Sequence, residues 1–332
     1  MIISKTPFRI SFFGGGTDYP EWYHENGGSV LATTIDKYCY ISCRHLPPFF
    51  EHKHRIVYSK IESVKTTEEI QHPVVRAVLS NLSITDGLEI HHDADLPARS
   101  GLGSSSSFTV GLINVLNALK GLQISKQDLA KQATYIEQEV LKETVGSQDQ
   151  VLAAFGGFNR IDFHPYDSFN ISPVIINKDL VEQLQSHMLL FFTGLSRFSS
   201  DIARDKVSNF TNRFQELTQI KEMVDEGMSI LQSPSTPIMD LGKLMHESWK
   251  LKRSLSAKVS TPKIDEIYEA GIKAGATGGK ILGAGGGGFI LFFAEPKNHK
   301  KILERLKSLV HVAFHFDDVG SKIVVYEPNG FK

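Results

Sequence analysis

The sequence has little of what disulfide-rich, membrane or strongly charged proteins need. Only two of its 332 residues are cysteines, Cys39 and Cys43. Their spacing places both on one side of a strand, so we expect two buried thiols; they are too few for a structural zinc site. No run approaches the roughly 18 apolar residues of a membrane helix, and the first residues lack a signal-peptide core, which predicts a cytoplasmic protein. The formal net charge of −1 gives no general attraction to nucleic acid or anionic membranes.

Strand-like and helical segments are mixed without regular alternation. "FRISFF" and "MLLFF" have the composition of buried strands, and apolar spacing predicts a helix from Ser105 to Leu119. A second helix is expected to begin at Ser125, a typical N-cap residue. These patterns favour an α+β protein in two halves, which we place at residues 1–178 and 179–332.

Two of the glycine-rich segments fail the test for a known nucleotide motif. "FFGGGTDYPEW" follows a strand, but a dinucleotide fingerprint would need glycine where Tyr19 stands. "ATGGKIL" would need glycine at Ala274 and a hydroxyl residue at Ile281 to be a P-loop. Neither a dinucleotide fold nor a P-loop fold is therefore predicted.

The remaining glycine loops favour phosphate binding. In "PARSGLGSSSS", Gly101 and Gly103 allow close approach, and the serines stand at the start of a helix, where N–H groups and the helix dipole attract anions. The alternative is a flexible loop with a serine-rich cap. A second loop, "KILGAGGGGF", is glycine apart from Ala284 between Gly283 and Gly288, and each glycine costs about 0.5–1 kcal/mol of backbone entropy. Two such loops fit the phosphates of a nucleotide.

Three motifs together resemble the GHMP kinases, the superfamily that includes galactokinase, homoserine kinase and mevalonate kinase. "TPFRISFFGGGTDY" (6–19) aligns without gaps on their first signature in its galactokinase form, "PARSGLGSS" (97–105) on the second, and "KILGAGGGGF" (280–289) on the third. The resemblance implies a two-lobed GHMP kinase fold. Its N-terminal lobe would be like domain 2 of ribosomal protein S5, with the phosphate loop and catalytic aspartate, and its C-terminal lobe would be ferredoxin-like, with the third motif.

The resemblance also implies ATP and Mg²⁺ as cofactors and assigns roles to residues. Asp149 would be the general base or would orient the acceptor hydroxyl, and Arg9 would stabilise transferring charge and restrain Asp149. Ser105 and Glu137, twelve residues before Asp149, would hold Mg²⁺, with Glu139 as the competing carboxylate. The expected ATP contacts are Gly101, Leu102, Gly103, Ser104, Ser105, Ser106, Gly285 and Gly286.

The acceptor is implied to be a sugar or sugar phosphate. Asp18, with Gly15, Gly16 and Thr17, would bind it; Gly15 and Gly16 replace the Glu-His of galactokinases and leave room for a larger sugar. "GGGTDYPEW" resembles the heptose-phosphate kinases and the kinase portion of fucokinases. The implied reaction is phosphorylation of the anomeric hydroxyl of a heptose 7-phosphate. The alternatives are a free sugar of fucose or galactose type, or a catalytically weak sugar and nucleotide sensor.

A phosphorylated acceptor needs a local cation because the whole chain is nearly neutral. Arg197, at the start of a predicted helix after "MLLFF", could bind a phosphate bidentately, or it could be a surface arginine beside Asp201. Arg99 and Lys142 are weaker candidates. Neither nucleic acid nor membrane is an expected partner, and the sequence does not predict an oligomeric state.

Overall fold

Two β-sheets organise the chain in this computed structural model, which describes all residues except 48, 99, 196–198 and 329–332. Within the described residues, nine strands form the first sheet, whose main path runs β13-β1-β2-β5-β3-β4. β6 extends it from β2, β7 pairs with β6, and β12 pairs with β2. Its strands are β1 (Ile2–Phe13), β2 (Gly28–His45), β3 (His54–Val57), β4 (Ile61–Val64), β5 (Leu88–Ala94), β6 (Phe158–His164), β7 (Ser168–Pro173), β12 (Phe316–Asp317) and β13 (Lys322–Tyr326).

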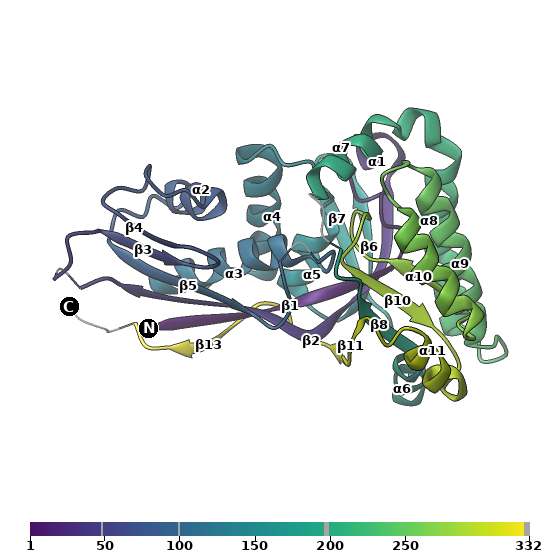
Figure 1. Cartoon of the computed structure of the whole chain (residues 1–332). Helices are drawn as coiled ribbons and strands as arrows, with labels where there is room; N and C mark the ends of the chain where they lie inside the picture. Colours follow the sequence, from purple (N-terminus) through teal and green to yellow (C-terminus); the bar gives the residue numbers. More distant parts are fainter. Residues whose placement is uncertain (48, 99, 196–198, 329–332) are drawn as a thin grey trace.

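The second sheet is antiparallel and has the order β11-β8-β10-β9 among the described residues. It consists of β8 (Met188–Phe192), β9 (Gly278–Ile281), β10 (Phe289–Phe293) and β11 (Val310–Val312). Long helices pack beside it at one end of the molecule (Figure 1). The helices of this half are α6 (Lys178–Ser186), α7 (Ser199–Ser208), η2 (Phe210–Arg213), α8 (Phe214–Gln232), α9 (Met239–Ser254), α10 (Pro262–Lys273), η3 (Pro296–Asn298) and α11 (His299–Arg305).

The helices of the N-terminal half, apart from Pro20–Asn26 beside the long helices, cover one face of the first sheet (Figure 1). They are α1 (Pro20–Asn26), α2 (Pro73–Asn81), α3 (Ser104–Leu119), α4 (Lys126–Tyr135), the π-helical turn η1 (Ile136–Val140) and α5 (Gln148–Phe155). α3 packs on β1 and β2 and is buried along most of its length. It ends before Gly121, whose φ of +71° is a conformation that favours glycine.

Several expectations from the sequence agree with the fold. The structure is α+β, α3 begins one residue before the expected Ser105, and the Ser125 side chain caps α4 by accepting from the N–H of Asp128. Cys39 and Cys43 are free, buried thiols on β2. None of the helices within the described ranges is long and apolar enough to cross a membrane.

The end of the chain returns to the sheet where it began. β13 pairs with β1, and β12 pairs with β2, so residues 316–317 and 322–326 belong to the first sheet although they lie in the predicted 179–332 half. The main hydrophobic core likewise contains residues of both halves, for example Phe13, Leu190 and Leu291. The boundary at 178 and 179 stays a prediction, and the two halves are tied together by these strands.

Candidate active site

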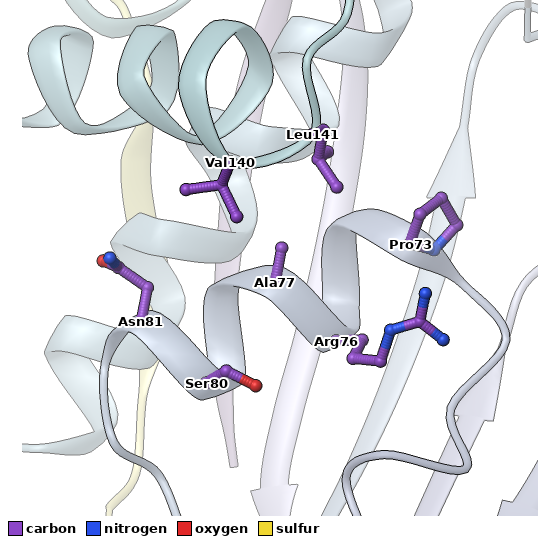
Figure 2. Close-up of a pocket in the computed structure, with 7 residues that line it drawn as sticks. All are labelled: Pro73, Arg76, Ala77, Ser80, Asn81, Val140 and Leu141. Atoms are coloured by element: carbon purple, nitrogen blue, oxygen red, sulfur yellow. The ribbon is translucent and has the colours of Figure 1, made fainter.

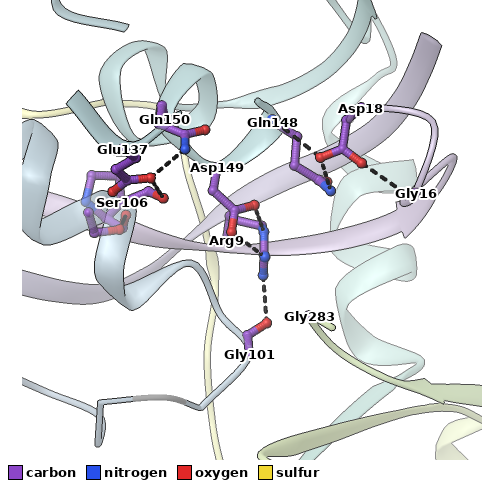
Figure 3. A network of polar contacts seen from close by, with 12 residues as sticks. Arg9, Gly16, Asp18, Gly101, Ser106, Glu137, Gln148, Asp149, Gln150 and Gly283 are labelled. Atoms are coloured by element: carbon purple, nitrogen blue, oxygen red, sulfur yellow. Dashed lines mark hydrogen bonds and ion pairs between the residues drawn. The ribbon is translucent and has the colours of Figure 1, made fainter. Parts of the chain in front are cut away.

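A paired arginine and aspartate connect three of the sequence motifs. Arg9 lies buried in the middle of β1, and its Nε and Nη2 each donate a 2.6 Å hydrogen bond to a different oxygen of the Asp149 carboxylate. Its third nitrogen, Nη1, donates to the carbonyl of Gly101 at 2.7 Å (Figure 3). The geometry is bidentate and charge-assisted, which fixes both side chains. Arg9 thus joins the first motif to the serine-rich loop and to α5.

The Asp149 carboxylate remains reachable from outside. It stands in the first turn of α5, and its side chain is 22% exposed, against 5% for Arg9. Burial raises the pKa of Asp149, and the Arg9 guanidinium opposes that rise, while Asp18 adds to it. An ionised carboxylate offers about four lone-pair sites, and Arg9 takes two of them. Asp149 can therefore accept a further hydrogen bond from a hydroxyl group.

Asp18 is a second buried carboxylate beside this pair. One of its oxygens accepts the N–H of Gly16 at 2.8 Å, and the other accepts the Gln148 side-chain amide at 2.9 Å. The backbone also contributes, because the Ser147 N–H donates to the Asp18 carbonyl at 2.8 Å. Figure 3 shows Asp18 with its partners Gly16 and Gln148 beside the Arg9–Asp149 pair.

The turn before α1 is held by a threonine hydroxyl. Thr17 donates to the carbonyls of Gly14 at 2.9 Å and Ser29 at 3.0 Å. Gly14 has a φ of +82°, and a Cβ there would lie 1.9 Å from the Ser29 carbonyl oxygen. Thr17 is therefore used in shaping the turn that presents Asp18 and the backbone of Gly15 and Gly16.

The two glycine loops touch each other. A Cβ at Gly101 would lie 2.6 Å from the carbonyl oxygen of Leu282, and one at Gly283 would lie 2.5 Å from the Gly101 Cα. The Phe289 N–H donates to the Ser100 carbonyl at 3.0 Å, which ties the loops across the two sheets. Gly103, at φ +77°, brings the loop against Asp149. The structure therefore places the second and third motifs side by side, next to the Arg9–Asp149 pair.

A third carboxylate, Glu137, lies under the start of α3. It is fully buried and accepts hydrogen bonds from Ser106 at 2.9 Å, Thr109 at 2.6 Å and Gln150 at 2.5 Å. Burial raises its pKa to about 7. Glu139, the competing carboxylate, is exposed and pairs with Lys142. The π-helical turn decides which of the two glutamates points inward. In it the Leu141 N–H donates a hydrogen bond to the Ile136 carbonyl at 2.9 Å.

The serines of the phosphate loop differ in their surroundings. Ser104 begins α3, and Ser105 follows it and is exposed, whereas Ser106 is buried and faces Glu137. Leu102 is buried, and its carbonyl accepts the N–H of Arg9 at 3.1 Å. Gly285 and Gly286 lie in the second glycine loop, where the Gly286 N–H donates a hydrogen bond to the Val259 carbonyl at 2.8 Å. Backbone hydrogen bonds therefore fix both glycine loops in place.

Two buried lysines that sequence reasoning did not single out support the second loop. Lys252, on α9, donates to the carbonyls of Ile281 at 2.7 Å and Gly283 at 2.6 Å. Lys280, on β9, donates to the Phe12 carbonyl at 2.7 Å, and burial lowers its pKa to about 7. The sequence does contain a pattern that indicates a buried Lys252, because this lysine follows Met245 and Trp249 at helical spacing on an otherwise buried face.

Of the three candidate phosphate-binding cations, the structure describes Lys142 alone. Arg197 and Arg99 lie outside the described residues. Lys142 is largely exposed and forms its ion pair with Glu139 at 2.7 Å. A surface hollow of about 530 Å³ between α2 and η1 is separate from the polar network (Figure 2); it is lined by Pro73, Arg76, Ala77, Ser80, Asn81, Val140 and Leu141. Its lining residues include no carboxylate.

Two family models match the chain in the regions that carry the second and third motifs. The GHMP kinases N terminal domain matches residues 69–157, and the GHMP kinases C terminal domain matches residues 235–311. The chain belongs to the GHMP kinase family. It is an ATP-dependent phosphotransferase whose acceptor is a hydroxyl group, and the two-lobed α+β fold expected from the motifs is confirmed.

Relatives place this GHMP kinase near enzymes of sugar metabolism. It is 28% identical to the D-glycero-alpha-D-manno-heptose 7-phosphate kinase of Campylobacter jejuni, over 92% of this chain and 93% of the relative. It is 26% identical to the bifunctional fucokinase/GDP-fucose pyrophosphorylase of Arabidopsis thaliana, over 91% of this chain but 31% of that longer protein. The crystal structure of a D-glycero-D-manno-heptose 1-phosphate kinase from Bacteroides thetaiotaomicron has the same fold, with a TM-score of 0.79, 24% identity, and coverage of 98% and 100%.

Proposed function

We propose that this GHMP kinase is a sugar kinase that transfers the γ-phosphoryl group of ATP to the anomeric hydroxyl of D-glycero-D-manno-heptose 7-phosphate, giving the 1,7-bisphosphate. The observation that carries the proposal is the bidentate Arg9–Asp149 pair, partly open to solvent, between the glycine loops and buried Asp18. The heptose as substrate is supported by the Campylobacter jejuni relative and by the glycines at positions 15 and 16.

In this proposal the two loops bind the nucleotide. The backbone from Gly101 to Ser106 and the start of α3 would surround the phosphates, with Gly285 and Gly286 opposite. N–H groups at a helix start favour anions, and α3 is a 16-residue helix. Phosphoryl transfer is catalysed mainly by positioning and by positive charge around the transferring group. Arg9 supplies such a charge at a fixed place.

The residues present fit a magnesium ion. Mg²⁺ is usually held by one or two carboxylates together with substrate phosphates, and its ligands are oxygen atoms. Glu137 provides a carboxylate, Ser105 an exposed hydroxyl and Ser106 a second hydroxyl that could share the role. In addition, Gln150 Oε1 is buried next to Glu137 and has no hydrogen-bond partner in the part of the chain that the structure describes. When bound, the ion would offset phosphate charge; we propose that Glu137 and Ser105 hold it.

Asp149 and Asp18 would arrange the acceptor. Asp149 has lone pairs left for the reacting hydroxyl and can orient it and take its proton, which the Arg9 contact leaves possible. Asp18, with the turn formed by Gly15, Gly16 and Thr17, would bind other sugar hydroxyls. We further propose that Arg197 binds the 7-phosphate.

A coupled ADP-release screen over phosphorylated and free sugars tests the substrate. We expect the heptose 7-phosphate to give the highest kcat/KM, at least tenfold above free fucose and galactose. Efficient turnover of fucose or galactose with none of the heptose phosphate would replace this proposal with a free-sugar kinase, a reading that the fucokinase relative would then support. ADP release that no sugar accelerates would point instead to a sensor.

A further inference from the structure

Helix α7 packs on α1 through an apolar cluster. Ala203 and Phe210 pack with Tyr19, Trp22 and Leu217 in this cluster. Figure 1 shows α7 beside α1, at the end of the molecule where the long helices lie. Lys206 stands three residues after Ala203 in α7, so the two side chains share one face of the helix. The packing that fixes α7 therefore also directs a lysine inward.

Lys206 is a largely buried lysine whose ammonium has no hydrogen-bonding partner among the described residues and is not sealed from solvent. The residue is 4% exposed, and its Nζ lies 4.4 Å from the centre of the Tyr19 ring. Within the described residues it forms no hydrogen bond and no ion pair closer than 4.0 Å. The charges of Asp18 and Asp149 raise its pKa, although burial, the larger effect, lowers it. The ammonium thus lies over the ring of Tyr19, the residue that follows Asp18, and forms no ion pair with Asp18 or Asp149.

The other buried cations of the site are all satisfied. Arg9 bonds to Asp149 and Gly101, Lys252 to two carbonyls, and Lys280 to one. A buried charge without a partner is costly unless something binds to it. Lys206 is the exception among these four, and its three N–H donors are available to a ligand beside Tyr19 and Asp18.

We propose that Lys206 is an acceptor-binding residue that donates a hydrogen bond to a hydroxyl oxygen of the sugar, next to the hydroxyl that Asp149 contacts. A neutral hydroxyl fits this position better than a phosphate, because a phosphate dianion there would meet the charges of Asp18 and Asp149. The inference rests on the proposed sugar kinase function. It assigns to α7 a direct part in sugar recognition, separate from binding of the 7-phosphate.

The test is the Lys206→Met variant, which keeps the length of the side chain and removes its charge. With heptose 7-phosphate as acceptor, its KM should rise about 10- to 100-fold, as expected for a lost hydrogen bond to a charged group, while the KM for ATP stays within twofold. Inorganic phosphate, used as a probe, should inhibit both proteins equally. Lys206→Arg should recover part of the affinity. The matched control is Lys258→Met, because Lys258 is an exposed lysine paired with Asp205 of α7.

Three results would overturn the inference while leaving the sugar kinase function standing. The first is an unchanged acceptor KM in folded Lys206→Met. The second is a Lys206→Met protein that does not fold, since the charge would then serve the fold. The third is a loss of inhibition by inorganic phosphate that parallels the acceptor KM. If the wild-type protein phosphorylates no sugar at all, the proposed function fails, and this inference fails with it.

Discussion

Replacing Asp149 with asparagine should damage both stability and turnover. The change keeps the shape of the side chain but places an NH₂ group against a donor nitrogen of Arg9, where a 2.6 Å hydrogen bond existed. Removing one partner of a buried ion pair costs about 3–5 kcal/mol. Because the Asp149 side chain is 22% exposed and Arg9 keeps its bond to Gly101, we expect the lower end of that range, about 3 kcal/mol.

The effect on catalysis should be separable from the effect on stability. At a temperature where the Asp149→Asn protein is still folded, kcat should fall about 10²- to 10⁴-fold, the usual contribution of a general base. Denaturant unfolding gives the free energy, and a coupled ADP assay gives kcat. Arg160 and Asp162 form a control pair in which Nε of Arg160 reaches both Asp162 oxygens at 3.0 Å, and both side chains are more exposed.

For the control, Asp162→Asn should cost about 1 kcal/mol or less and leave kcat unchanged, because Arg160 is 29% exposed against 5% for Arg9 and solvent-accessible ion pairs contribute little. The reasoning would be refuted by Asp149→Asn activity within about threefold of the wild type. It would also be refuted if Asp149→Asn lost no more stability than Asp162→Asn, because the pair with Arg9 would then be energetically unimportant.

Three further predictions concern the metal, a buried lysine and the 7-phosphate. Glu137→Gln should raise the Mg²⁺ concentration needed for half-maximal activity and Glu139→Gln should not; the reverse pattern in a Mg²⁺ titration would exchange their roles. Folding lowers the pKa of Lys280 to about 7, so above that pH the Lys280 amine is protonated to a greater extent in the unfolded chain than in the folded protein. The unfolding free energy of the wild type minus that of Lys280→Met should therefore rise between about pH 7 and 9, by up to about 1.4 kcal/mol per pH unit, and a flat difference in denaturant titrations would contradict this. Arg197→Ala should raise the KM for heptose 7-phosphate at least tenfold and leave that for ATP within twofold; equal changes in both would reject a phosphate role.

The parts of the fold and site that depend on local pattern could be predicted from the sequence. The start of α3, the capping role of Ser125 and the buried strands β1 and β8 follow from residue spacing, turn chemistry and apolar runs. Arg9 and the glycine loops were also identifiable, since their motifs are short and continuous. Their functional roles stay predictions, but the structure does bring them together.

The parts that depend on long-range pairing or on exact helix register could not be predicted. β12 pairs with β2 across more than 270 residues, and nothing local in "HFDD" indicates this. The π-helical turn decides that Glu137 is buried and Glu139 exposed, and a sequence pattern cannot fix such a one-residue change. Lys206 was overlooked because a lysine on a helix is usually solvated, although its neighbours on that face are apolar.

Phosphorus NMR of the product tests the central claim most directly. The protein is incubated with ATP, Mg²⁺ and D-glycero-D-manno-heptose 7-phosphate, and the sugar is followed without coupling enzymes. We predict that a second sugar phosphate signal grows in step with ADP and shows coupling to the anomeric proton, while the 7-phosphate signal remains. ADP formation without a new anomeric phosphate, or a new phosphate coupled to any other proton, would contradict the account.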